Sequence, residues 1–307
     1  MRTRKIGSLD VSVVGLGCNN FGSRLDATAT AAVVDACFEE GINFFDTADV
    51  YGNTLSEEYL GKALGARRAQ VVVATKFAGA YGDMEGGGKA DYVRRAVAAS
   101  LRRLGTDYID LYIYHRPDPA TPIAETLGAL NELVKEGTVR EIGCSNFSVA
   151  QLREAEQAGA GGASFVNLQN EYNLLERGDE AEVLPECERL GIGYVPYFPL
   201  ASGLLTGKFR RNKDLPAGTR IAAMDEERRS RFYNERNLDI VEELAIYTES
   251  RGHQLLDAAF SFALTRPAVA SVIAGAMRPE QVAGNAKAAS WELSSEEIEA
   301  IDAMTIR

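Results

Sequence analysis

The stretch IDLYIYHRPDPATPIAETLGALNELVKEGTVREIGC, residues 109–144, holds one complete structural unit of this chain. It opens with an apolar run of strand length at 109–114 and closes with another at 139–144. Between the two runs, apolar residues recur on one face of a helix: Ile123, Leu127, Leu130 and Val134. Thr121 can cap the start of this helix, and Gly137 can take the left-handed conformation that ends it. The stretch therefore predicts a strand, a helix and a second strand.

The same unit repeats along the chain. Short apolar runs predict eight strands, near residues 13–17, 42–45, 71–75, 109–114, 139–144, 164–168, 193–197 and 270–274. Most neighbouring runs are separated by enough chain for one crossover helix, as parallel strands require. The seventh and eighth runs are the exception, because a long insertion with a helical stretch at about 237–251 separates them.

These features predict an α/β protein, a (β/α)8 TIM barrel. The opening residues 3–14 alternate around a turn at Gly7, which predicts an N-terminal β-hairpin closing one end of the barrel. A length of 307 residues fits either one barrel or two doubly wound domains. No proline-rich or Ser/Gly linker divides the chain, so we favour a single barrel domain over residues 1–307 with the long insertion between strands 7 and 8.

Composition and charge exclude several function classes. Lys and Arg number 33 against 44 Asp and Glu, and a net charge of -11 disfavours nucleic acid and anionic membrane surfaces as partners. The four cysteines form no Cys-x-x-Cys pair and the first residues are charged, so we expect a protein of the reducing cytoplasm. With only two histidines, a His-rich metal site is not expected. The sequence leaves the oligomeric state open.

Polar residues follow the apolar runs where a barrel enzyme places its chemistry, at the C-terminal ends of the strands. They are Asp46, Lys76, His115, Ser145, Asn146 and Gln169. Tyr51 follows Asp46 in the segment INFFDTADVYG, residues 42–52. Singly, these residues have ordinary structural explanations, such as a turn cap, a rim charge or a core histidine. Their shared position at consecutive strand ends favours a common catalytic role.

Four of these residues suit proton transfer to a carbonyl. A tyrosine ordinarily titrates near about 10, so we expect an ammonium from Lys76 to lower the pKa of Tyr51. Asp46 would keep that lysine charged and oriented, and His115 could hold a substrate oxygen by hydrogen bonding. The sequence therefore predicts a catalytic set of Asp46, Tyr51, Lys76 and His115, and no metal.

The chain resembles the aldo-keto reductase superfamily over nearly its whole length. The motifs that carry the resemblance are Gly15-Leu16-Gly17, Asn43 through Gly52, Thr75-Lys76, Asp110 through His115, Gly143 through Phe147, Gln169 through Asn173 and Gly203 through Lys208. The resemblance implies a barrel that binds NADPH, or NADH, without a Rossmann domain. It also implies that Tyr51 protonates a carbonyl oxygen while the nicotinamide delivers hydride to the carbon.

The resemblance further implies a set of cofactor-binding residues. Ser145, Asn146 and Gln169 would hold the carboxamide, and Tyr197 would stack on the nicotinamide. Phe198 stands where the family often has a serine beside the pyrophosphate. The other expected cofactor contacts are Gly17, Leu200, Gly203, Leu205 and Lys208, with Gly275, Arg278 and Gln281 around the adenosine phosphate and Asn285 facing adenine. Gly275 and Ala276 lack the hydroxyl or lysine that is frequent there, which weakens the case for NADP over NAD.

The function expected from the resemblance is reduction of an aldehyde or ketone to an alcohol, with the reverse reaction on sugars or alcohols as a variant of the same activity. Aromatic residues just after strand ends could line the substrate pocket: Phe21, Phe77 and Tyr81. Two alternatives remain. One is a nicotinamide-nucleotide-sensing regulatory subunit without turnover, as some relatives of the family are. The other is an aldolase-like enzyme in which Lys76 forms a Schiff base.

Overall fold

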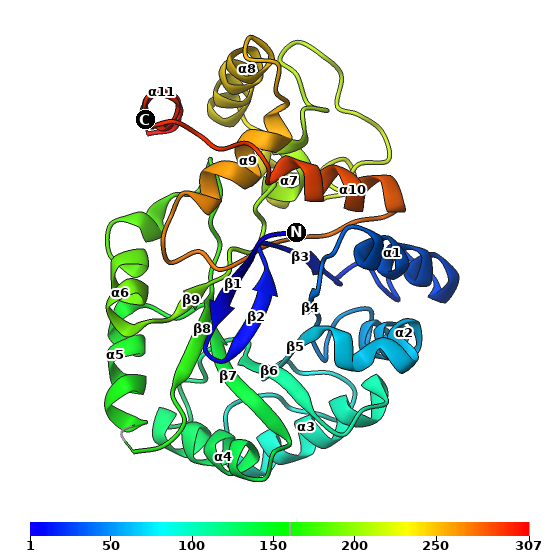
Figure 1. Ribbon diagram of the computed structural model, residues 1–307, viewed down its shortest axis with the longest axis vertical. Helices are drawn as coiled ribbons and strands as arrows, with labels where there is room; N and C mark the ends of the chain where they lie inside the picture. Colours follow the sequence, from blue (N-terminus) through cyan, green and yellow to red (C-terminus); the bar gives the residue numbers. More distant parts are fainter. Residues whose placement is uncertain (160, 307) are drawn as a thin grey trace.

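A parallel eight-stranded sheet forms the centre of the computed structural model, which describes residues 1–159 and 161–306 (Figure 1). The strands pair in the order β10-β3-β4-β5-β6-β7-β8-β9. Their bounds are β3 (Val14–Gly17), β4 (Phe44–Asp46), β5 (Val72–Phe77), β6 (Ile109–Tyr114), β7 (Val139–Ser145), β8 (Phe165–Gln169), β9 (Gly193–Tyr194) and β10 (Val272–Ala274). Each strand coincides with one of the eight apolar runs, so the predicted (β/α)8 fold is confirmed.

Helices cover the outside of the curled sheet, one after most strands (Figure 1). They are α1 (Ala27–Glu39), α2 (Leu55–Leu64), α3 (Ala90–Leu104), α4 (Ile123–Lys135), α5 (Val149–Ala158) and α6 (Val183–Leu190), with short 3-10 turns η1 (Gly65–Gln70) and η2 (Gly178–Glu180). The sheet closes where Tyr194 of β9 meets the chain before β10. There Ala270 N donates to Tyr194 O at 2.8 Å.

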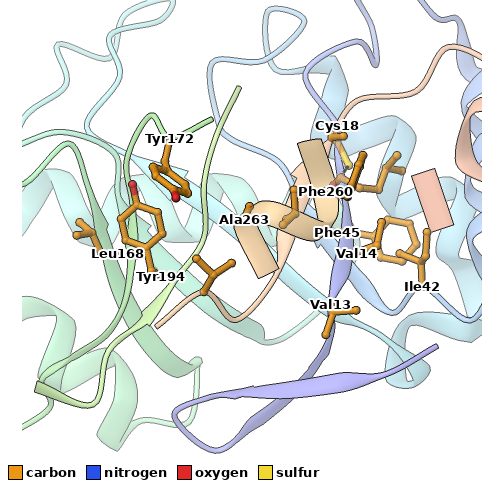
Figure 2. Packing of buried hydrophobic residues seen from close by; sticks show 14 of the residues in the cluster. Val13, Val14, Cys18, Ile42, Phe45, Leu168, Tyr172, Tyr194, Phe260 and Ala263 are labelled. Atoms are coloured by element: carbon orange, nitrogen blue, oxygen red, sulfur yellow. Dashed lines mark hydrogen bonds between the residues drawn. The ribbon is translucent and has the colours of Figure 1, made fainter. Parts of the chain in front are cut away.

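Two apolar layers flank the strands because successive side chains point to opposite faces. The inner layer is filled by Phe44, Val72, Ala74, Leu111, Ile113, Val195, Ala270 and Ile273. The outer layer packs the strands against the helices. Figure 2 shows part of it, with Ile42, Phe45 and Val14 grouped near Phe260. The parity of a strand residue therefore decides whether it faces the barrel interior or the helices.

The N-terminal hairpin closes the end of the barrel where the strands begin. Its strands β1 (Thr3–Ile6) and β2 (Leu9–Ser12) pair antiparallel, and their apolar side chains join the inner layer. Ser8 N donates to the Glu141 carboxylate at 2.7 Å, and Ser12 N donates to Asn43 Oδ1 at 2.7 Å. These contacts fix the hairpin, and the predicted N-terminal β-hairpin is confirmed.

The predicted insertion lies between β9 and β10 and contains η3 (Ala201–Thr206), α7 (Glu226–Phe232), α8 (Glu235–Glu249) and α9 (Leu255–Leu264). Helices α10 (Pro279–Ala288) and α11 (Ser295–Thr305) follow β10. The five helices gather at the top of Figure 1, away from α3 and α4. Arg210 joins the loop after η3 to α8 through Glu242 at 2.8 Å and Glu249 at 2.6 Å. No helix among the described residues is long and apolar enough to cross a membrane.

The ends of α4 show where local sequence signals succeed and fail. Gly137 has a φ of 76°, as predicted for the residue that ends the helix. The predicted cap at Thr121 is wrong, because α4 begins at Ile123 and Pro122 takes the capping position. Thr121 Oγ1 instead donates to Asp118 Oδ2 at 2.7 Å. The nearby carboxylate competes successfully for the hydroxyl.

Two helical glycines provide a test of packing on the outer layer. A Cβ on Gly61 of α2 would lie 2.3 Å from Leu104 O at the end of α3, whereas a Cβ on Gly128 of α4 would meet no atom within 4 Å. We expect Gly61→Ala to lower the free energy of unfolding by roughly 1–3 kcal/mol, because backbone must move. The control Gly128→Ala should raise it by about 0.5–1 kcal/mol through helix propensity. Urea unfolding of both variants measures this, and a stabilised Gly61→Ala protein contradicts the close approach.

Candidate active site

One inward-facing position from each strand lies at the C-terminal rim of the barrel. Every second residue of a strand points into the barrel. Lys76 therefore points the same way as Val72 and Ala74, and His115 the same way as Leu111 and Ile113. The eight positions are Gly17, Asp46, Lys76, His115, Ser145, Gln169, Tyr197 and Gly275. The predicted residues therefore gather at one end of the fold, opposite the hairpin.

A buried ion pair between Lys76 and Asp46 is the centre of this rim. Lys76 Nζ lies 2.5 Å from Asp46 Oδ1, and both residues are only 2% exposed. Lys76 Nζ also donates to Thr47 O at 2.7 Å, and Gln169 Nε2 donates to Asp46 Oδ2 at 2.6 Å. Burial disfavours the Lys76 ammonium, but Asp46 and Tyr51 outweigh burial and raise the pKa of Lys76. Lys76 is therefore held as a charged, immobile donor.

Tyr51 and His115 complete the predicted catalytic set around this lysine. Lys76 Nζ lies 5.1 Å from the centroid of the Tyr51 ring. The Tyr51 and His115 ring centroids are 6.0 Å apart at an interplanar angle of 78°. Tyr51 sits in the turn from β4 to α2, where Ser56 Oγ anchors the turn by donating to Cys18 O at 2.9 Å. The four predicted side chains therefore lie within mutual reach.

The predicted lowering of the Tyr51 pKa is wrong in its net direction. Burial raises the pKa of Tyr51 above its ordinary value of 10, Lys76 lowers it and Asp46 raises it, and the sum is a rise. The expected effect of the ammonium is present but smaller than that of burial. Tyr51 is therefore a protonated phenol at neutral pH, the form a proton donor needs.

His115 is a neutral hydrogen-bonding group. Burial, followed by the charges of Lys76 and Arg116, lowers its pKa to about 3. A neutral imidazole keeps one N–H donor and one acceptor nitrogen. This state fits the predicted role of holding a substrate oxygen.

Asn146 and Tyr197 form a polar corner next to the catalytic set. Tyr197 donates its hydroxyl to Asn146 Oδ1 at 2.8 Å. Asn146 Nδ2 donates to His115 O at 2.9 Å and to Ser145 Oγ at 3.0 Å. Asn146 has a φ of 62° and is exposed, which turns its amide toward the rim. The structure thus brings the predicted carboxamide-binding residues together.

The predicted phosphate-binding segment has an irregular backbone. Phe198 has a φ of 52°, Ser202 of 58° and Gly203 of 100°, so several residues take the left-handed conformation in a short span. Leu205 is buried in the outer layer, Leu200 is partly buried against it, and Lys208 is exposed. Of the predicted residues in this segment, Lys208 places its charge in solvent.

The predicted adenosine-phosphate residues lie around the start of α10. Gln281 Oε1 accepts from Met277 N at 2.7 Å, which orients the turn before the helix. Arg278 is exposed and lies 3.4 Å from Glu280, while Asn285 is buried. Gly275 is exposed, and a Cβ on Gly17 would lie 3.6 Å from Gly275 N. A Cβ on Gly275 would lie 3.0 Å from Asn20 Nδ2, so the chain packs closely where β10 meets β3.

The structure does not bring the predicted substrate-lining aromatics to the catalytic set. Phe77 follows the inward Lys76, so it faces outward and stacks on Tyr114 with ring centroids 5.0 Å apart. Phe21 is fully buried in the outer layer. The Tyr81 hydroxyl accepts a hydrogen bond from Arg103 Nη1 at 3.4 Å, on the side of α3. These placements favour packing roles.

Two shallow grooves lie at the opposite end of the barrel. Their volumes are about 580 and 590 Å³, and both are lined by Asp107 and Tyr108, which precede β6. Neither contains a residue of the catalytic set. The chemistry of the side chains, rather than the size of these grooves, identifies the candidate site.

Sequence reasoning missed Arg220, a polar residue of the insertion. Its guanidinium lies 5.7 Å from the centroid of the Phe198 ring and is partly buried. Burial lowers the pKa of Arg220, and the charge of Arg24 lowers it further. Among the described residues it has no ion pair or hydrogen bond. A partly buried cation without a counter-ion suits an anionic ligand, but only the folded insertion brings it to Phe198.

Fold and site together define a barrel with a tyrosine, lysine, aspartate and histidine at its C-terminal rim. The model of the Aldo/keto reductase family matches residues 13–306. The chain therefore belongs to the aldo/keto reductase family, whose members use nicotinamide cofactors.

Relatives of the chain have several descriptions. It is 36% identical over 280 residues to a probable voltage-gated potassium channel subunit beta of Oryza sativa subsp. japonica, covering 87% of this chain and 84% of that protein. It is 38% identical over 244 residues to probable aldo-keto reductase 1 of Glycine max, covering 75% and 69%. The solved structure of a glycerol dehydrogenase from Gluconobacter oxydans matches with a TM-score of 0.85 and 30% identity, covering 98% of this chain and 94% of the other.

The neutral state of His115 can be observed directly, because the chain has only two histidines. We expect its ring C–H resonances to show no titration from about pH 8 down to about pH 4.5 in NMR spectra, since its pKa is about 3. The variant His253→Asn assigns the remaining signals. In the unfolded chain His115 has a pKa of about 6.5, so the unfolded state binds this proton first. The free energy of unfolding should therefore fall as the pH drops below about 6.5. Titration of the His115 ring near its ordinary value contradicts a desolvated imidazole.

Proposed function

We propose that this protein is an NADPH-dependent oxidoreductase that reduces an aldehyde or ketone carbonyl to an alcohol, with Tyr51 as the general acid. The observation that carries the proposal is the convergence of Tyr51 and His115 on the buried Lys76–Asp46 pair. We place it in the cytoplasm, where its four free cysteines would stay reduced.

The polar corner fits a nicotinamide ring with its carboxamide. Asn146 presents an exposed amide, Ser145 and Gln169 lie on the neighbouring strands β7 and β8, and the Tyr197 ring stands beside them. Amide and hydroxyl groups match the donor and acceptor atoms of a carboxamide. A bound nicotinamide would supply hydride to the carbonyl carbon. The residues present therefore suit the cofactor that the family uses.

The residues of the catalytic set would divide the proton chemistry of the reduction. Tyr51 would give its hydroxyl proton to the carbonyl oxygen, and the Lys76 ammonium would stabilise the resulting phenolate. Asp46 would hold Lys76 in place and charged. The neutral imidazole of His115 would orient the carbonyl by hydrogen bonding. Because Asp46 and Tyr51 keep Lys76 protonated, the arrangement opposes a Schiff-base role for this lysine, which needs a free amine.

Cationic residues would hold the phosphates of the nucleotide. Arg220 beside Phe198 has no counter-ion among the described residues and would meet the pyrophosphate, with Lys208 nearby in sequence. Arg278 and Gln281 at the start of α10 would meet the adenosine phosphate, which favours NADP over NAD. The substrate would be a small carbonyl compound or, in the reverse direction, an alcohol, as the similarity to a glycerol dehydrogenase suggests.

Removing the Tyr51 hydroxyl tests the reaction. Tyr51→Phe should lower kcat by about 100-fold or more with aldehydes and ketones, because a positioned acid is lost. The variant should still bind NADPH, which can be measured from the fluorescence of the cofactor. Tyr59→Phe on α2 is the matched control and should leave turnover unchanged. Full turnover in the Tyr51→Phe protein would show that another group donates the proton.

Removing the Arg220 charge tests the cofactor site. Arg220→Met should raise the Kd for NADPH by about 10-fold or more, since a charge-assisted hydrogen bond to phosphate is lost. Lys213→Met removes a charge from the exposed part of the same insertion and should change the Kd little. Titrations with NADPH and NADH in parallel measure both effects. Equal effects of the two substitutions would mean that Arg220 acts only through long-range charge.

A second function, a nucleotide-sensing regulatory subunit without turnover, is favoured by the similarity to plant proteins described as probable potassium channel beta subunits. Both functions use the same cofactor site. Tight NADPH binding together with no NADPH oxidation across aldehydes, ketones and aldoses would support the regulatory function. Turnover that depends on Tyr51 would support the reductase.

A further inference from the structure

A hydrogen bond from Gln169 to Asp46 crosses the mouth of the barrel. Gln169 ends β8 and Asp46 ends β4, and three strands lie between these two in the sheet. Gln169 Nε2 donates to Asp46 Oδ2 at 2.6 Å, and the two residues are 1% and 2% exposed. A buried contact between strands that are not neighbours fixes one side of the rim relative to the other.

The charge of Asp46 decides which way the Gln169 amide points. An ionised carboxylate only accepts hydrogen bonds, so the NH2 group of the amide faces Asp46 and the amide oxygen faces away. Main-chain pairing holds this end of β8 in place, because Asn146 N donates to Gln169 O at 3.0 Å. Among the described residues, Gln169 Oε1 accepts no hydrogen bond. That oxygen is therefore free for a ligand, such as the NH2 group of a nicotinamide carboxamide.

Gln169 completes the hydrogen bonding of Asp46 at the oxygen that the lysine leaves open. Lys76 binds Asp46 Oδ1, and the amide of Gln169 binds Oδ2. A buried carboxylate oxygen without a partner is strongly unfavourable, so without the amide the carboxylate would turn toward the ammonium or take up a proton. Gln169 therefore holds Asp46 in one orientation and in its charged form.

The orientation of Asp46 in turn sets that of the Lys76 ammonium. An ammonium has three N–H donors, and two of them go to Asp46 Oδ1 and Thr47 O. The third is available to Tyr51, whose ring centroid lies 5.1 Å from Lys76 Nζ and whose hydrogen bond with the lysine helps to raise the pKa of Lys76. A carboxylate that turned would redirect all three donors. Gln169 thus begins a chain of contacts that ends at Tyr51.

We propose that Gln169 is a positioning residue for proton donation, acting through Asp46 and Lys76 on the reacting tyrosine. The inference rests on the proposed function. In the reduction, Tyr51 gives its hydroxyl proton to the carbonyl oxygen, and the ammonium stabilises the phenolate that remains. No proton leaves the amide of Gln169, which acts only by holding its neighbours in place. This role is distinct from holding the carboxamide, which uses the other end of the same amide.

Replacing the amide by a carboxyl group of the same shape tests this role. In Gln169→Glu two carboxyl groups face each other at hydrogen-bond distance, and such a pair shares one proton until a rising pH removes it. The shared proton replaces the amide N–H, so kcat should be within about threefold of wild type at about pH 6 and about tenfold or more below it at about pH 8.5. Gln157→Glu adds the same charge at an exposed position of α5 and should match wild type at both pH values.

Gln169→Met removes the N–H group at every pH and nearly keeps the length of the side chain. Its kcat should be about tenfold or more below wild type at both pH values, because a hydrogen bond to a buried charge is lost. The Kd for NADPH separates the two ends of the amide. It should rise in Gln169→Met, which loses both ends, and stay within about threefold of wild type in Gln169→Glu at about pH 6, because the outward oxygen is kept.

Thermal unfolding of the cofactor-free protein provides a readout that does not need turnover. A glutamate in an unfolded chain titrates near about 4.3, whereas a carboxyl group in contact with Asp46 keeps its proton to higher pH. The penalty to stability therefore appears as the pH rises. The Tm of Gln169→Glu should fall further below that of wild type at about pH 8.5 than at about pH 6.

Three results would overturn the inference. They are an equal loss of kcat at both pH values in Gln169→Glu, a wild-type kcat in Gln169→Met, and a Tm difference in Gln169→Glu that does not widen with pH. Failure of the proposed function is a different result, because full turnover in Tyr51→Phe would leave the pH-dependent Tm of Gln169→Glu in place.

Discussion

The buried ion pair between Lys76 and Asp46 fixes the geometry of the whole C-terminal rim. Two charges can remain buried only if their hydrogen-bonding capacity is met, and here Thr47 O and the Gln169 amide meet it. These partners come from β4, β5 and β8, so the pair ties together strands that are far apart in the sequence. Tyr51 is then placed by the turn that leaves β4, and His115 directly follows β6. The candidate site thus connects the C-terminal ends of several strands across the barrel.

The alternation of side chains along each strand explains how the rim combines stability with chemistry. Inner-layer residues such as Val72, Ala74 and Leu111 fill the barrel, and the next position of the same parity carries a polar group. The glycines Gly17 and Gly275 take that position where β3 meets β10, and neighbouring atoms pack closely against Gly275. Strand ends therefore change from packing to polar function within two residues.

Much of the fold could be predicted from the sequence, because apolar runs and helical periodicity are local signals. The gathering of Asp46, Lys76 and His115 at the rim could also be predicted, since these residues come at the ends of those runs, and Tyr51 follows Asp46 by one short turn. The outward direction of the Phe77 side chain could likewise be predicted from the sequence, because Phe77 is the next residue after the inward-facing Lys76. Arg220 and the raised pKa of Tyr51 could not be foreseen. They depend on how the insertion folds back and on how much water the folded rim excludes.

The N-terminal hairpin determines from which end of the barrel a ligand can reach the polar rim. Its apolar side chains complete the inner layer, and its backbone is fastened to Glu141 and Asn43 at the base of the strands. The side chains of the inner layer and the hairpin together close this end of the barrel, so a ligand that reaches the polar rim must approach it from the side where the strands end.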